Sequence, residues 1–268
     1  MGEPTFRMDL PTGRGFYLWK MPSCERGDVT RIIERCVRTG VSWLAIKAGD
    51  QGHVWAQFTP VLVKQLQAAG IRVFGWSYDV PGQALAQAKV VRHVLDCGAN
   101  GFITDSEIEW DNATVPDAAA REYVHAIGDA APGFLVLDAP WPIIRSHGAF
   151  PFTEFGRLVG GRCPQVYWVE MTGGAEDVFV RYRENWTSYE SKPDHPRHPH
   201  FPSGSLYHKR DKDTHAITKA CMPADVATFE RMAFRAGCLG VLHWEWSQVP
   251  ALVWAALESG EIPCWGNV

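Results

Sequence analysis

Residues 101–110 carry three carboxylates at alternate positions, Asp105, Glu107 and Glu109, directly after a short apolar run. Side chains alternate along a strand, so this spacing predicts that the three acids share one face. Like charges held together raise the pKa of at least one of them. Such a group suits chemistry that needs one protonated acid beside one ionised carboxylate. The alternative is that the strand ends near Asp105 and a solvated loop follows.

The elements that must position these acids follow from the alternation of strand-like and helix-like segments, which predicts an α/β fold. The expected strands are residues 15–20, 41–48, 71–78, 101–107, 133–139, 165–168, 216–222 and 239–246. The expected helices are residues 28–40, 59–70, 83–97, 117–130, 175–189, 224–236 and 249–257. Eight such repeats in about 250 residues predict a (β/α)8 TIM barrel, here one domain over residues 1–268. An open doubly wound sheet is the alternative, but residues 21–27 contain no glycine-rich phosphate-binding turn.

Composition narrows the partners. The net charge is −4 and no basic block exists, so a nucleic-acid partner is not expected. No apolar run is long enough to span a membrane, and residues 1–11 lack a secretory-signal pattern. We therefore expect that the protein is made in the cytoplasm and that it either stays there or is exported by a non-classical route. Seven dispersed cysteines without a CxxC pair indicate buried thiols, and we expect neither a cofactor nor a metal.

In a barrel, functional residues gather at the carboxyl ends of the strands. There we expect Glu107 to act as general acid and Asp105 as its orienting or nucleophilic partner in cleaving a glycosidic bond. Gln165 or Tyr167 could orient the reacting group. Lys47 either pairs with the acids or forms a structural ion pair inside the barrel. The remaining candidates are supporting carboxylates and aromatic platforms for sugar rings: Glu109, Glu245, Trp19, Trp76, Tyr78, Trp168 and Trp244.

Two of these expectations have open alternatives. Glu245 faces outward if His243 or Trp244 points into the barrel. Residues 191–213, rich in Pro, His and Lys, predict an irregular insert that forms an active-site loop. The prolines break this segment into an extended or kinked loop, so its histidines have no fixed spacing as metal ligands. A solvated loop is therefore favoured over a metal site. A metal-dependent hydrolase that uses Asp105, Glu107 and a loop histidine remains a further hypothesis.

Residues 101–109 resemble the Asp-x-Glu strand-four signature of barrel glycoside hydrolases of the lysozyme-like (family 25) and chitinase-like (family 18) kinds. Residues 15–19, 46–50, 75–78, 105–110, 164–168 and 243–246 are similar to a poorly characterised group of glycoside-hydrolase-like barrel proteins from bacteria and their phages. The resemblance implies a TIM-barrel glycosidase that acts on a polysaccharide or cell-wall glycan.

The chain departs from both families at specific positions. Trp19 and Lys20 stand where family 25 lysozymes have an acid after strand one, and the longer acidic signature of chitinase-like enzymes is absent. A non-catalytic carbohydrate-binding barrel, or a virion or cell-surface component that retains the fold, is therefore the alternative function.

Overall fold

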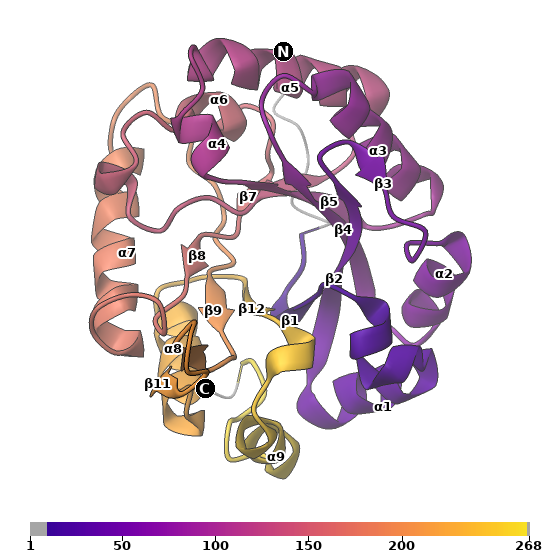
Figure 1. Ribbon diagram of the computed structural model, residues 1–268, viewed down its shortest axis with the longest axis vertical. Coiled ribbons are helices and arrows are strands. Elements are labelled where there is room, and N and C mark those ends of the chain that lie inside the picture. The colour runs from indigo at the N-terminus through magenta and orange to yellow at the C-terminus, as the bar shows by residue number, and fades with distance from the viewer. Residues whose placement is uncertain (1–9, 267–268) are drawn as a thin grey trace.

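Short runs of β-branched, aromatic and small residues form one parallel sheet in the computed structural model, which describes residues 10–266. Its strands are β1 (Gly13–Leu18), β2 (Val41–Asp50), β4 (Arg72–Asp79), β5 (Gly101–Ser106), β6 (Val136–Asp138), β7 (Gly161–Arg162), β8 (Gln165–Val166), β9 (Ser203–Ser205) and β12 (Gly240–Trp244). They pair in the order β7-β6-β5-β4-β2-β1-β12-β9-β8, and Figure 1 shows them as a central ring. A short strand, β3 (His53–Val54), pairs antiparallel with the end of β2.

The sheet closes on itself because β7 and β8 are consecutive pieces of one segment. Cys163 N donates a hydrogen bond to Asp138 O of β6 at 2.6 Å. On the other side, Ser203 N of β9 donates to Pro164 O at 2.7 Å. Residues 161–166 therefore act as one barrel strand, interrupted because Pro164 has no amide hydrogen. The predicted (β/α)8 barrel is confirmed.

Helices enclose this ring (Figure 1). They are α1 (Val29–Thr39), α2 (Pro60–Ala68), α3 (Ala84–Asp96), α4 (Ile108–Asp111), α5 (Pro116–Ala130), α6 (Phe152–Gly156), α7 (Ala175–Glu190), α8 (Pro223–Arg235) and α9 (Ala251–Ser259). Local sequence sets their ends: the Asp28 side chain accepts hydrogen bonds from Thr30 N and Arg31 N, and Gly40 ends α1 in the left-handed region. Within residues 10–266, no helix combines the length and apolar character that crossing a membrane requires.

The prediction that residues 216–222 form the seventh barrel strand is wrong. Residues Ile217–Lys219 form β11, which pairs antiparallel with β10 (Lys209–Arg210) in a separate hairpin. The barrel strand is β9, which lies within the predicted irregular insert at residues 191–213. Its Ser-Gly-Ser sequence gives no apolar alternation, but small residues are required there: a Cβ on Gly204 would lie 2.7 Å from the His243 ring.

Large aromatic side chains fill the barrel from alternate strand positions. Trp43 contacts Phe74 and Phe201 edge-on, with ring centroids 5.5 and 5.9 Å apart. Gly15 makes room for this layer, since a Cβ there would lie 2.3 Å from the Trp43 ring. Toward the carboxyl ends of the strands, Tyr17 contacts Trp76 at 5.7 Å and Trp244 at 5.2 Å.

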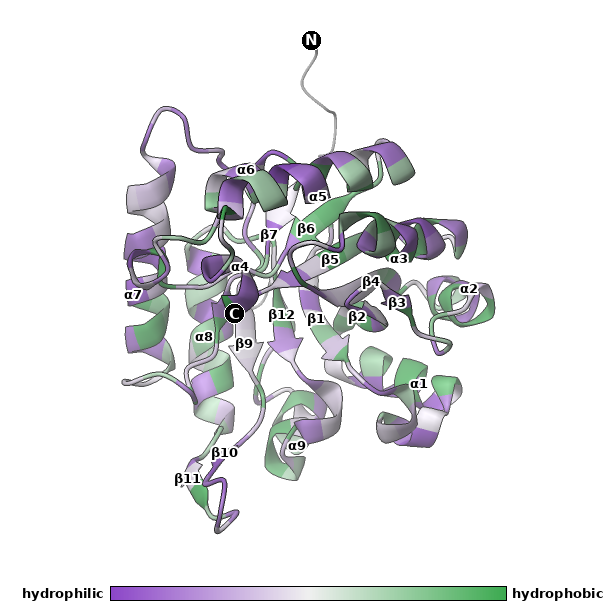
Figure 2. Cartoon of the chain, turned by 45° about the horizontal axis from the view of Figure 1, so that its top comes forward, coloured by the Kyte–Doolittle hydropathy of each residue, from purple (hydrophilic) through white to green (hydrophobic). Residues whose placement is uncertain are grey.

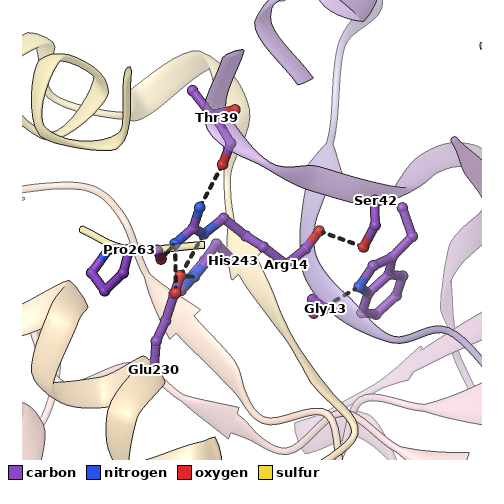
Figure 3. A network of polar contacts seen from close by, with 8 residues as sticks. Gly13, Arg14, Thr39, Ser42, Glu230, His243 and Pro263 are labelled. Carbon is purple, nitrogen blue, oxygen red and sulfur yellow. Dashed lines mark hydrogen bonds and ion pairs between the residues drawn. The ribbon is translucent and has the colours of Figure 1, made fainter. Parts of the chain in front are cut away.

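A buried polar network ties the barrel to α8 near the amino ends of the strands (Figure 3). Arg14 of β1 donates to both carboxylate oxygens of Glu230, at 2.7 and 2.6 Å, and its third nitrogen donates to Thr39 O at 2.5 Å. His243 of β12 contacts the same carboxylate at 2.8 Å through Nε2. Burial lowers the pKa of His243, so a neutral imidazole donates this bond. All three side chains are fully buried.

Candidate active site

A cavity of about 430 Å³ opens at the carboxyl ends of the strands; we call it the site cavity. It is lined by these residues that the sequence predicted: Trp19, Lys47, Trp76, Tyr78, Asp105, Glu107, Gln165, Tyr167 and Trp244. Its floor is aromatic, because Trp76 and Trp244 contact each other edge-on with centroids 5.4 Å apart. Asp50 and Gln51 complete the lining. Asp50 stands at the carboxyl end of β2, whereas nothing in the sequence points to Gln51.

The two central carboxylates are held by one amide. Gln165 Nε2 donates to Asp105 Oδ1 at 3.0 Å and to Glu107 Oε1 at 3.1 Å. Burial raises the pKa of Asp105 well above its ordinary value, and the negative charge of Glu107 raises it further. Burial also raises the pKa of Glu107, against the lowering effect of the Gln165 hydrogen bond. The pair therefore retains a shared proton to a higher pH than isolated carboxyl groups would.

The alternation predicted through residue 109 does not extend that far. The strand β5 ends at Ser106, Glu107 precedes the short helix α4, and Glu109 lies on that helix. Glu107 nevertheless joins Asp105 in the site cavity. Glu109 accepts a hydrogen bond from the Tyr78 hydroxyl at 2.5 Å, so it contacts a wall residue without lining the cavity.

Lys47 is the cation of the site cavity. Its ammonium pairs with Asp50 Oδ2 at 2.5 Å and lies 4.7 and 4.8 Å from the ring centroids of Trp76 and Trp55. It also lies 5.7 Å from the centroid of Trp19. Lys47 thus forms an ion pair inside the barrel mouth, as the second of the two predicted roles requires, and it also lines the site cavity. Its partner is Asp50, which the sequence did not assign to it.

Two predicted candidates lie elsewhere. Glu245 is buried and accepts hydrogen bonds from Ser247 N and Oγ, so it caps the turn at the end of β12. Trp168 packs on Phe229 outside the barrel, with centroids 5.0 Å apart. Of the two residues before Glu245, Trp244 points into the site cavity, whereas His243 points toward α8. Glu245 itself does not line the site cavity.

The loop histidines also have other partners. His198 Nε2 contacts Gly156 O at 2.8 Å, and His200 lies between Tyr182 and Glu190. Neither lines the site cavity, so the geometry does not bring a loop histidine to Asp105 and Glu107. In the described part of the chain, no group of three or more His, Cys, Asp or Glu side chains is arranged to hold a metal ion.

Asp79, the last residue of β4, is fully buried and accepts a hydrogen bond from the hydroxyl of Tyr123 on α5 at 2.7 Å. Burial raises its pKa from 3.8 to about 7. The folded protein therefore holds a proton that the unfolded chain has lost, and stability falls as pH rises through this window. Asparagine cannot ionise. We expect the stability of Asp79→Asn relative to the unchanged protein to increase by about 2 kcal/mol between pH 5 and pH 7.

Urea unfolding at both pH values measures this difference. The control is Asp96→Asn, which removes an exposed carboxylate paired with Arg92 on α3. The two variants should differ in pH dependence. A parallel pH dependence in the two variants would contradict the assignment of a raised pKa to Asp79.

The chain folds as a TIM barrel with a pair of carboxylates at its mouth, and solved structures support that fold. A chitinase from Bacteroides thetaiotaomicron superposes with a TM-score of 0.68 at 12% identity, covering 95% of this chain and 97% of the neighbour. The spore cortex-lytic enzyme SleL from Bacillus cereus gives a TM-score of 0.64 at 11% identity, covering 92% of this chain and 73% of that enzyme.

A glycoside hydrolase family 18 N-acetylglucosaminidase from Paenibacillus barengoltzii gives a TM-score of 0.63 at 9% identity, covering 93% of this chain and all (100%) of the neighbour. At these identities the similarity establishes the fold. It agrees with the chitinase-like part of the resemblance, whereas the family 25 part is not supported. No protein-family model and no curated protein sequence matches the chain.

Proposed function

We propose that the protein is a glycoside hydrolase that cleaves a polysaccharide of the chitin or cell-wall kind. The observation that carries this proposal is the pair Asp105 and Glu107, bridged by Gln165 inside an aromatic cavity at the barrel mouth. The named activities of the structural neighbours support the substrate class: two act on chitin or on N-acetylglucosamine linkages, and one lyses spore cortex.

The geometry divides the chemistry between the two acids. Glu107 lies just beyond the carboxyl end of β5 and, when protonated, donates its proton to the oxygen of the departing sugar. Asp105, two residues earlier in β5, stays ionised in that microstate and stabilises the positive charge that develops on the sugar ring before water adds to it. Trp244, which is half-buried in the cavity lining, offers an aromatic ring on which a pyranose can stack.

The direct test is release of new reducing ends from a panel of soluble polysaccharides. Glycol chitin and solubilised peptidoglycan represent N-acetylated glycans, and carboxymethyl cellulose and starch serve as controls. We expect cleavage of at least one N-acetylated glycan and none of the controls. Binding to a glycan without cleavage would support the non-catalytic carbohydrate-binding barrel, and cleavage of starch or cellulose alone would overturn the substrate class.

A further inference from the structure

Three cavities lie side by side along the barrel mouth, each sharing lining residues with the next. Gln165 and Tyr167 line both the site cavity and a second cavity of about 330 Å³, which we call the stacked cavity. Glu170 lines the stacked cavity and a third of about 520 Å³, the basic cavity. The rings of Tyr167 and Tyr207 also meet edge-on across this path, with centroids 6.3 Å apart. The three cavities therefore follow one another in the order that a chain-like ligand would need.

The stacked cavity has the walls of a sugar-binding site. The rings of Trp141 and His147 lie parallel, with centroids 4.1 Å apart and an interplanar angle of 4°. Asp111 fixes the imidazole at 2.7 Å from His147 Nδ1. The rest of the lining is mostly apolar and includes Ile143 and Met171. This surface suits the apolar face of a pyranose ring rather than a charged group.

The basic cavity has the opposite character. Lys209, Arg210 and Lys212 line it, against the single carboxylate of Glu170, which pairs with Lys209 at 3.1 Å. The nearby acid Asp211 does not line this cavity, and its side chain accepts hydrogen bonds from the amides of Asp213 and Thr214. Arg210 and Lys212 are exposed, on a hairpin that projects beyond the carboxyl ends of β9 and β12 (Figure 2).

The three cavities thus differ in charge, with acids in excess in the site cavity and cations in excess in the basic cavity. Asp50, Asp105 and Glu107 oppose one lysine at the reacting end, and three cations oppose one acid at the far end. A neutral polysaccharide such as unmodified chitin has no group that uses this separation. A glycan with an anionic substituent does, because only one placement keeps its negative charge away from the reacting carboxylates and next to the cations.

We infer that the substrate is an anionic glycan, bound with a neutral ring in the site cavity, the next ring on the Trp141–His147 stack, and a negatively charged substituent in the basic cavity. This inference deepens the proposed function and rests on it for the cleavage step. The anion is a carboxylate or a phosphate, since either accepts charge-assisted hydrogen bonds from Arg and Lys.

The test compares polymers that share one backbone but differ in charge. Binding of Glu107→Gln protein to neutral glycol chitin, carboxymethyl chitin and phosphorylated chitin is measured by affinity electrophoresis and calorimetry at low salt. We expect an anionic polymer to bind about 5-fold tighter than the neutral one, as two exposed ionic contacts allow. The arm with the larger gain identifies the anion. Adding salt should erase the preference, because it screens exposed charges.

The double variant Arg210→Gln/Lys212→Gln should bring the ratio of the two affinities toward one. Its matched control is Lys64→Gln/Lys89→Gln, which removes the same charge from exposed positions on α2 and α3 and should keep the ratio. Equal binding of neutral and anionic polymers by the protein with its basic residues intact would overturn the inference, and so would binding of none. Preferential binding without cleavage by the wild-type protein would instead uphold it and count against the proposed hydrolase function.

Discussion

Replacing Glu107 with glutamine lowers the kcat for glycan hydrolysis by about 10³-fold and leaves substrate affinity nearly unchanged. Glutamine has the shape of glutamic acid but has no proton to donate to the departing oxygen. Its amide oxygen can still accept the hydrogen bond from Gln165 that Glu107 Oε1 accepts now. The fold and the cavity therefore survive, and the loss falls on the chemical step. Reducing-end kinetics on the glycan identified by the panel measure the change.

The pH profile separates loss of an acid from loss of structure. Burial raises the pKa of Glu107, so the protonated, active form persists to a higher pH than for a free carboxyl group, and activity falls above it. The remaining activity of Glu107→Gln should lack this limb. The matched control, Glu122→Gln on the exposed face of α5, should keep both the rate and the profile. Unchanged hydrolysis by Glu107→Gln would remove the assignment of Glu107 as general acid.

Local patterns were sufficient to predict most of the barrel, because each βα unit carries its own signals. The segment from Asp28 to Asp50 shows this: a capping aspartate, an apolar helix face, a terminal glycine and a strand follow one another as expected. The same reasoning failed at β9. A strand of small residues is required there by the ring of His243 on β12, a contact that depends on the closed barrel and has no local signature.

The candidate site divides in the same way. Asp105, Gln165 and Tyr167 were predicted from position, since strand ends converge at one mouth of a barrel. Whether Trp244 or Glu245 points inward depends on strand register, which local alternation alone cannot set. Trp141 and His147 form the stacked cavity from a long connection after β6, and only tertiary contacts, such as that of His147 with Asp111, bring them there.

Replacing Glu230 with glutamine should cost about 3–5 kcal/mol of unfolding free energy, because it leaves the guanidinium of Arg14 buried without a counter-charge. Burial alone would raise the pKa of Glu230, but the charge of Arg14 and the hydrogen bonds from His243 and Arg14 lower it overall. The ionised carboxylate of Glu230 therefore stabilises the fold at any pH above the ordinary carboxyl pKa. This stabilisation is lost as the pH falls through the pKa that Glu230 has in the folded protein. Chemical unfolding at neutral and acidic pH should therefore show the penalty shrinking in acid.

Two comparisons distinguish an uncompensated buried charge from general damage to the core. Glu258→Gln removes an exposed partner of Arg35 and Arg38 and should cost less than about 1 kcal/mol. The double variant Arg14→Met/Glu230→Gln removes the buried cation together with its partner, so it should be more stable than Glu230→Gln alone. If the double variant were instead less stable than Glu230→Gln, packing of the Arg14 side chain between β1 and α8 would contribute more to stability than its ion pair with Glu230, which Figure 3 shows.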